Sequence, residues 1–102
     1  MRYRVRILPS VYDELLEILT YIATDSGSAA RKLVDQILLA IRALSDGKVR
    51  HSCVRPARKS KLSVHRMIVQ GYLVYYRVDE AHSSIVVLTV RHGARRQPRR
   101  FD

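Results

Sequence analysis

The spacing of apolar residues changes along this 102-residue chain, and that change limits the folds it can adopt. Residues 11–44 place apolar side chains every three or four positions, as amphipathic helices do, whereas residues 64–92 alternate apolar and polar side chains, as half-buried strands do. Residues 2–8 alternate in the same way ahead of the helical segment, with arginines on one side. A strand, helices and then a group of strands indicate an α+β fold.

Turn-forming residues divide the helical segment into two helices. Ser10 and Asp13 resemble a capping box, which predicts that the first helix begins at Ser10. The run Asp25-Ser26-Gly27-Ser28 interrupts the pattern, either serine can cap the second helix, and Gly47 predicts its end. Helices joined by so short a loop are expected to pack as an antiparallel hairpin.

The second half predicts three strands, at residues 64–69, 72–78 and 84–92, joined by short turns. Gln70-Gly71 can form a two-residue hairpin turn. Strands connected in this way imply an antiparallel meander, which the helices must cover on one face. The predicted order is therefore β-α-α-β-β-β, with the helical hairpin packed on one face of a small antiparallel sheet.

One domain is expected over residues 1–102, since a chain of this length supports one core. Residues 48–63 lack periodicity and are expected to form a surface connector with room for one short strand. Residues 93–102 are expected to be a mobile basic tail.

Charge is distributed unevenly along the chain. Nineteen Lys and Arg against nine Asp and Glu give a net charge of +10. Residues 1–47 hold six basic and six acidic residues, whereas residues 48–102 hold thirteen basic and three acidic, so the whole excess lies in the second half. A basic half predicts an anionic partner, either nucleic acid or an acidic protein segment.

Composition excludes several classes of protein. No apolar run approaches the roughly 20 residues of a membrane span. No apolar segment follows the basic N-terminus, so no signal peptide is expected. Cys53 is the single cysteine, which excludes an internal disulfide and fits the reducing cytoplasm.

Motifs for metal and cofactor chemistry are missing. His51-x-Cys53 has no second pair of ligands, so no metal is expected. The four glycines are isolated and cannot form a phosphate-binding loop, so no cofactor is expected. Paired catalytic carboxylates are not expected either, because Asp79 and Glu80 have the pattern of turn residues.

The remaining candidates for chemistry are cationic and lie on the last three predicted strands. They are His65, Arg66, Arg77, Arg91 and His92. Such groups can cleave RNA, with a base, an acid and an arginine that stabilises the charged phosphorane. The alternative is a basic face that only binds phosphate or carboxylate.

Tyrosines on the predicted strands allow two interpretations. Tyr72, Tyr75 and Tyr76 could stack on bases, as aromatic residues on sheets do. Tyr72 and Tyr76 share a face with valines, however, and are expected in the core.

The first helix carries more apolar surface than one packed face requires. A second stripe, formed by Tyr12, Leu16 and Leu19, lies beside the first. Either this helix is covered on two sides within its own domain, or the second stripe is a docking surface for a partner.

Three motifs together resemble the RelE/ParE superfamily of toxin–antitoxin toxins. They are Pro9-x-x-x-Asp13-x-Leu15-x-x-Ile18-x-x-Tyr21-Ile22-Ala23, then Arg66-x-x-x-x-Gly71-Tyr72-Leu73-Val74-Tyr75-Tyr76-Arg77-Val78, then Ile85-x-x-Leu88-x-Val90-x-His92-Gly93-Ala94-Arg95. The resemblance spans residues 2–98 and is greatest to the ParE branch, often named plasmid-stabilisation proteins. It implies a bacterial toxin of a two-gene module, neutralised by an antitoxin with an acidic, partly disordered tail that contains a helix.

The two branches of this superfamily differ in target. ParE-like toxins inhibit DNA gyrase and block replication, whereas RelE-like toxins cleave mRNA on the ribosome. The ribonuclease branch commonly has an arginine where this chain has Leu73, and a His-Arg-x-x-x-Tyr motif where this chain has His92 but no tyrosine. The resemblance therefore favours a gyrase inhibitor with no assigned catalytic residue. The ribonuclease alternative would use Arg66, Arg77 and His92, and a third possibility is a non-toxic member that only binds antitoxin or nucleic acid.

Partner contacts are expected at two sets of residues. The candidates for target binding are Arg66, Arg77, Arg91, His92, Arg95 and Arg96. The candidates for antitoxin binding are Tyr12, Leu16, Leu19, Arg58 and Lys61. An acidic antitoxin tail would be attracted to the basic half, and an antitoxin helix would lay its apolar face on the second stripe.

Overall fold

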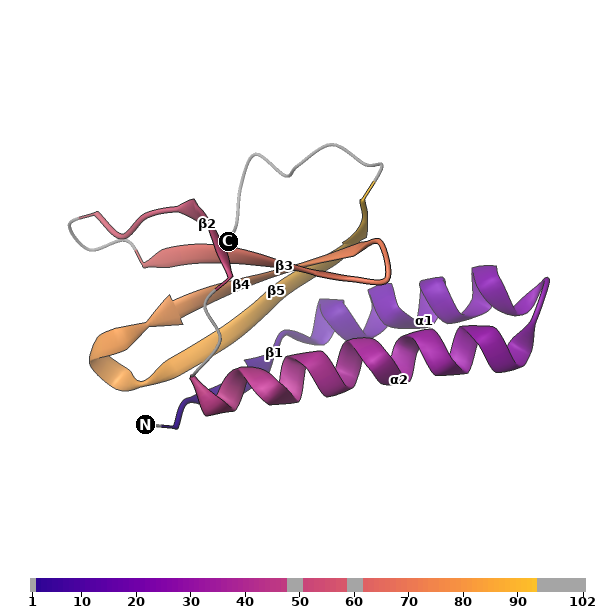
Figure 1. Ribbon diagram of the computed structural model, residues 1–102, viewed down its shortest axis with the longest axis horizontal. Coiled ribbons are helices and arrows are strands. Elements are labelled where there is room, and N and C mark those ends of the chain that lie inside the picture. Colours follow the sequence, from indigo (N-terminus) through magenta and orange to yellow (C-terminus); the bar gives the residue numbers. More distant parts are fainter. Residues whose placement is uncertain (1, 48–50, 59–61, 94–102) are drawn as a thin grey trace.

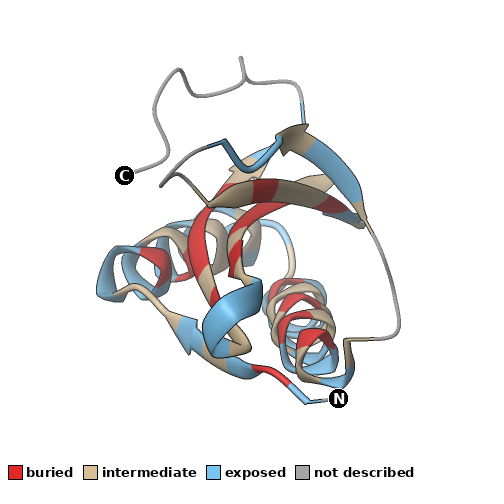
Figure 2. Cartoon of the chain, turned by 90° about the vertical axis from the view of Figure 1, so that its left-hand side faces the viewer, coloured by how far each residue is buried: buried red, intermediate tan, exposed pale blue. Residues whose placement is uncertain are grey.

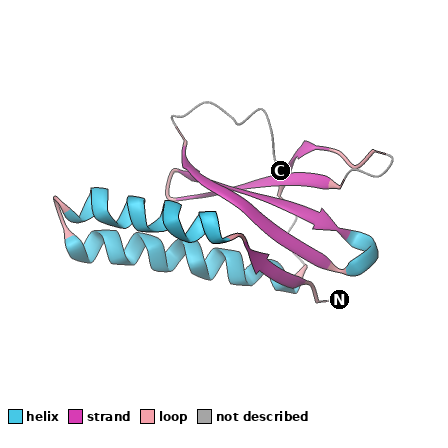
Figure 3. Cartoon of the chain, turned by 180° about the vertical axis from the view of Figure 1, so that it is seen from behind, coloured by secondary structure: helices cyan, strands magenta, loops and turns pink. Residues whose placement is uncertain are grey.

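The predicted helical hairpin on a sheet is confirmed, and the sheet has five strands (Figure 1). The computed structural model describes residues 2–47, 51–58 and 62–93. Both helices lie on the same side of the sheet (Figure 3). In chain order the elements are β1 (Arg4–Ile7), α1 (Pro9–Ala23), α2 (Gly27–Ala43), η1 (Leu44–Asp46), β2 (Ser52–Arg55), β3 (Ser63–Val69), β4 (Tyr72–Asp79), η2 (Glu80–His82) and β5 (Ser84–His92).

The strands lie in the spatial order β1-β5-β4-β3-β2. β3, β4 and β5 form the predicted antiparallel meander, and β2 extends it as an antiparallel edge strand. At the other edge β1 pairs parallel to β5, so the sheet is mixed and the expectation of an antiparallel sheet is corrected there. Alternation sets which side chains of β1 face the helices, but it carries no information on the direction of the neighbouring strand.

α1 begins at Pro9, directly after β1. The predicted capping box at Ser10 is wrong, because Leu8 occupies the N-cap position and no side chain caps the helix. Proline suits the first helical position, since its φ is already helical and its missing N–H would have no partner there. The backbone N–H of Leu8 donates to the carbonyl oxygen of Val87 at 3.2 Å, which holds the start of the helix against the sheet.

α2 begins where the sequence predicts and ends at Ala43, ahead of Gly47, with the short helix η1 between them. The hydroxyl oxygen of Ser26 accepts a hydrogen bond from the backbone N–H of Ala29 at 3.2 Å, so the first of the two serines is the cap. After η1 the chain turns at Gly47, whose φ of 71° is left-handed. Glycine adopts that conformation without a steric penalty, which explains why η1 ends there.

Apolar clusters lie on both faces of the sheet. The larger joins both helices to the sheet; Tyr76 is buried in it and Tyr72 is half-buried at its edge, which confirms their predicted place. The smaller, on the other face, is centred on Val64, Tyr75 and Leu88. Figure 2 shows buried residues on the sheet and on the sides of the helices that face it.

Beyond the end of β1, the carboxylate of Glu14 on α1 accepts the hydrogen bonds that β5 donates at this edge. The register between β4 and β5 shifts once, which leaves Leu88 as an extra, bulged residue. β1 pairs with β5 only as far as Val87. Beyond that point the Glu14 carboxylate accepts hydrogen bonds from the Thr89 hydroxyl at 2.7 Å and from the Val90 backbone N–H at 3.0 Å.

Some predictions for the connector and the tail lie outside the described residues. β2 is the short strand for which the connector had room, whereas residues 48–50 and 59–61 are not described. Only Gly93 of the tail is described, so the mobility of residues 93–102 stays a prediction.

Candidate functional site

The sheet face opposite the helices carries a line of arginines. In register, Arg6 pairs with Val86, Val86 with Arg77, Arg77 with Val64, and Val64 with Arg55. Directly paired residues point to the same face of a sheet. Arg6, Arg77 and Arg55 therefore form one row across all five strands, with a valine between neighbours; these three are called the arginine row below.

Two further predicted residues belong to this face. Arg66 pairs with Tyr75, and Arg91 pairs with Leu73. Arg66, Arg77 and Arg91 are half-buried, and no carboxylate of the described residues lies within 4.0 Å of their guanidinium groups. The structure thus brings together three of the predicted target-binding residues, with their charges not neutralised by an acidic side chain of the described chain.

His92 lies on the opposite face from Arg66 and Arg77, and Arg91, its neighbour at the end of β5, borders the groove on the His92 side as well. His92 pairs with Tyr72, and the two rings meet edge-on with their centroids 5.2 Å apart. Both line a groove of about 510 Å³ against α1, together with Glu14, Glu17, Ile18, Tyr21, Val90 and Arg91. The structure therefore does not bring His92 together with Arg66 and Arg77, the set that the ribonuclease interpretation would use.

The outer side of α1 is apolar and uncovered by the described residues. Tyr12 and Leu16 are 54% and 60% exposed, whereas Leu19 is half-buried. Tyr21 is 77% exposed and was not predicted for this surface, because it stands outside the stripe at helical spacing. A second groove, of about 550 Å³, is lined by Asp13, Leu16, Glu17, Thr20 and Tyr21. For Tyr12 and Leu16 the interpretation of a helix covered on two sides is wrong.

The other predicted contact residues fall in or beside undescribed segments. Arg58 is exposed. Lys61, Arg95 and Arg96 lie outside the described residues and stay predictions.

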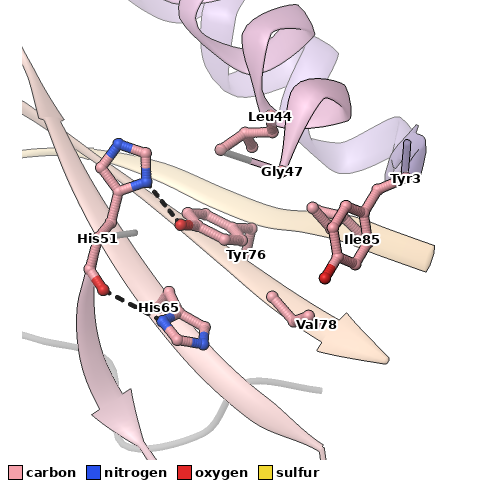
Figure 4. Close-up of a pocket in the computed structure, with 8 residues that line it drawn as sticks. All are labelled: Tyr3, Leu44, Gly47, His51, His65, Tyr76, Val78 and Ile85. Atoms are coloured by element: carbon pink, nitrogen blue, oxygen red, sulfur yellow. Dashed lines mark hydrogen bonds between the residues drawn. The ribbon is translucent and has the colours of Figure 1, made fainter. Parts of the chain in front are cut away.

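A cluster of histidine and tyrosine on the helix-side face was not predicted (Figure 4). His51 Nδ1 lies 2.7 Å from the Tyr76 hydroxyl, and the His65 ring stacks on the Tyr76 ring at 5.5 Å. His65 Nδ1 lies 3.3 Å from the His51 carbonyl oxygen. The cavity beside them, about 20 Å³, has room for one water molecule. His65 is thereby separated from Arg66, its neighbour in sequence, because successive strand residues point to opposite faces.

The surroundings of His51 disfavour its protonated form. Burial lowers the pKa of His51, and the nearby His65 lowers that pKa further. The neutral form of the His51 ring is thereby favoured, and this ring holds the start of β2 against Tyr76.

The described residues contain no group of three or more His, Cys, Asp or Glu arranged to hold a metal ion. Cys53 is exposed. None of the helices in the described part of the chain is long and apolar enough to cross a membrane.

The fold is that of small toxins from toxin–antitoxin systems. A chain of the chromosomal ParDE system from P. aeruginosa superposes with a TM-score of 0.68 at 16% identity, covering 89% of this chain and 96% of that one. The archaeal RelE–RelB complex from Pyrococcus horikoshii OT3 gives 0.57 at 18% identity, covering 94% and 100%. A mutant of the E. coli toxin RelE in the free state gives 0.58 at 13% identity, covering 92% and 86%.

The amino-acid sequence shows to which toxin family the chain belongs. Residues 5–97 match the family model described as the ParE toxin of the type II toxin–antitoxin system parDE. The protein belongs to this ParE toxin family. No curated protein sequence matches the chain.

Proposed function

We propose that this protein is the toxin of a type II toxin–antitoxin module that acts in the cytoplasm, inhibits DNA gyrase and so blocks replication. The observation that carries this proposal is the match of residues 5–97 to the ParE toxin family. The ParE branch, which the sequence resembles, acts on gyrase rather than on mRNA.

The alternative, a RelE-like ribonuclease that cleaves mRNA on the ribosome, has two observations in its favour. Arg66 and Arg77 lie on one face of the sheet, and the fold is shared with RelE. Two observations favour gyrase instead. Leu73 occupies the position of the arginine that would stabilise the phosphorane, and His92 lies on the other face of the sheet, where it cannot exchange protons beside the two arginines.

We assign neutralisation to a cognate antitoxin that contacts two surfaces. Its helix would lay an apolar face on Tyr12, Leu16 and Leu19, of which the first two are exposed. Asp13 and Glu17 flank this stripe, so the acidic tail of the antitoxin would be repelled there. That tail is instead drawn to the basic second half, where Arg58 and Lys61 are the candidate contacts.

Contact with the target is assigned to cationic residues of the second half. The candidates are Arg66, Arg77, Arg91, His92, Arg95 and Arg96. The first three share the sheet face that no described helix covers, which supports their role in binding an external partner.

Induction of the toxin in cells separates the candidate functions. DNA synthesis, plasmid supercoiling and mRNA integrity by primer extension are followed together, with and without the antitoxin from the same module. We expect DNA synthesis to stop, plasmids to relax and mRNA to stay intact, and the antitoxin to restore growth. Codon-associated mRNA cuts with normal supercoiling would establish the ribonuclease instead, and unaffected growth would identify a non-toxic family member.

A further inference from the structure

We propose that the uncovered face of the sheet binds the phosphodiester backbone of duplex DNA through the arginine row, without reading base sequence. This inference is separate from gyrase inhibition, because it concerns the toxin and DNA alone. It rests on the register of the strands, on the arginines Arg6, Arg66, Arg77 and Arg91, which have no carboxylate partner among the described residues, and on the burial of the aromatic residue at the centre of that face.

The register sets the length of the row. Neighbouring strands lie about 4.8 Å apart, so Arg6, Arg77 and Arg55 are about 10 Å apart and span about 19 Å. Each strand of duplex DNA presents a phosphate about every 3.4 Å along the helix axis. Each guanidinium of the row therefore has a phosphate within reach of its long, flexible side chain.

Four arginines of this face have no acidic partner among the described residues. Arg6 and Arg77 of the row, and Arg66 and Arg91 beside it, have no carboxylate of the described chain within 4.0 Å. Asp79, two positions after Arg77 on β4, is engaged by His82 at 2.8 Å. The other acidic residues are placed elsewhere: Asp13, Glu14, Glu17, Asp25, Asp35 and Asp46 lie on the helices and their connections, and Glu80 accepts a hydrogen bond from Tyr3.

The basic residues of this face are arginines, and arginine favours phosphate as its anionic partner. Arginine, rather than lysine, occupies every basic position on this face among the described strands. Its planar guanidinium donates two parallel hydrogen bonds to one phosphate, which a lysine ammonium cannot do. The Nε atoms of Arg77 and Arg91 are buried and have no hydrogen-bond partner in the described structure, so no protein acceptor holds these two guanidinium groups through Nε.

The apolar residues of the face favour a duplex backbone over the other anionic partners. Single strands are held by stacking on exposed aromatic rings, but Tyr75, the aromatic residue of this face, is fully buried. A protein partner needs an apolar pocket as anchor. Val64, between Arg77 and Arg55, is fully buried, and Ile68, which pairs with Leu73 on this face, is 67% exposed but lines no groove among the described residues. The large grooves of the described molecule lie along α1 instead.

Fluorescence anisotropy tests this proposal. The purified full chain is titrated into a labelled 20-base-pair duplex of arbitrary sequence at 50–300 mM KCl. The row variant Arg6→Gln/Arg55→Gln/Arg77→Gln is compared with a control of equal charge loss on the exposed surface of α2, Arg31→Gln/Lys32→Gln/Arg42→Gln. For each phosphate contact that is lost, the slope of log K against log salt becomes shallower by about 0.9. The row variant lacks three arginines, so its slope should be shallower by about 2.7. We expect affinity at 100 mM KCl to fall at least about tenfold for the row variant and less than about threefold for the control.

A variant with arginines replaced by lysines, Arg6→Lys/Arg55→Lys/Arg77→Lys, shows whether a loss of affinity in the row variant comes from lost charge or from a folding defect. It keeps the charge, so it should keep the salt slope and lose a few-fold in affinity through the lost bidentate bonds. Equal weakening by the row and control variants would overturn the proposal, because net charge alone would then explain binding. So would tighter binding of the single strand, displacement of DNA by polyglutamate at equal charge, or no binding of the duplex at 50 mM KCl.

Discussion

Glu14 bonds α1 to β5 through its side chain. Replacing it with alanine leaves the Thr89 hydroxyl and the Val90 backbone N–H without their acceptor. We expect Glu14→Ala to lower the free energy of unfolding by about 2–4 kcal/mol, since each bond goes to a charged group that is partly shielded from water. Urea denaturation measures the change. Glu17→Ala, on the exposed side one turn away, should stay within about 0.5 kcal/mol, and equal losses would contradict this role for Glu14.

His51 makes stability depend on pH. Its pKa in the folded protein is lowered from the ordinary value of 6.5 by burial and by His65, so the unfolded chain takes up the proton at higher pH than the native one. The stabilisation is complete above pH 6.5 and is lost as the pH falls through the folded pKa. We therefore expect the free energy of unfolding to fall more steeply between pH 7.5 and 5 for the native sequence than for His51→Gln. Parallel profiles would show that His51 is not the titrating group.

Single residues also show the limit of prediction from sequence. Alternation correctly assigned Tyr76 to the core. It would also place Leu88 and Val90 on one face, yet the bulge separates them into different clusters. A bulge inserts one residue into the period of two, so every later side chain changes face, and nothing in the local sequence marks the position. The role of Glu14 depends on that bulge and could not be predicted either.

The β3–β4 hairpin turns through two residues with positive φ, Gln70 at 50° and Gly71 at 83°. This is the backbone of a turn that favours Asn-Gly, so glutamine is a poor fit at the first position. We expect Gln70→Asn to raise the free energy of unfolding by about 0.5 kcal/mol and Gly71→Ala to lower it by about 1–2 kcal/mol. Thermal unfolding measures both, and a destabilised Gln70→Asn variant would refute this assignment of strain.

The exposed stripe of α1 is the element on which the antitoxin helix is proposed to dock. Leu16→Glu places a charge in the centre of that stripe, so we expect affinity for the antitoxin to fall at least about 30-fold, the effect of losing one anchor residue. Leu39→Glu on α2, where Leu39 is 62% exposed, is the matched control and should leave affinity nearly unchanged. Calorimetric titration measures both. An equal loss of antitoxin affinity in the two variants would show that the antitoxin does not dock on α1.

Elements defined by local pattern were predictable, and pairings between distant segments were not. Helical spacing and turn residues predicted α1, α2 and the β3–β4–β5 meander. The parallel pairing of β1 with β5 joins residues about 80 positions apart, Arg4 with Ser84, and no local signal encodes it.

At the scale of the whole molecule, charge differs between the two layers. The helical segment, residues 9–47, holds six acidic and three basic residues, whereas the arginines of β1 and the basic second half belong to the sheet side. The count of charges in each half predicted a basic surface. It did not predict the arginine row, because the row exists only once the register of all five strands is known, including that of Arg6 from the neutral half.

A supercoiling reaction with purified gyrase and relaxed plasmid tests the central claim most directly. We expect the purified toxin to inhibit supercoiling at stoichiometric excess over gyrase, the antitoxin to restore it, and translation in a cell-free extract to continue at the same toxin concentration. Uninhibited supercoiling together with arrested translation and cleaved mRNA would contradict the account and identify a ribonuclease.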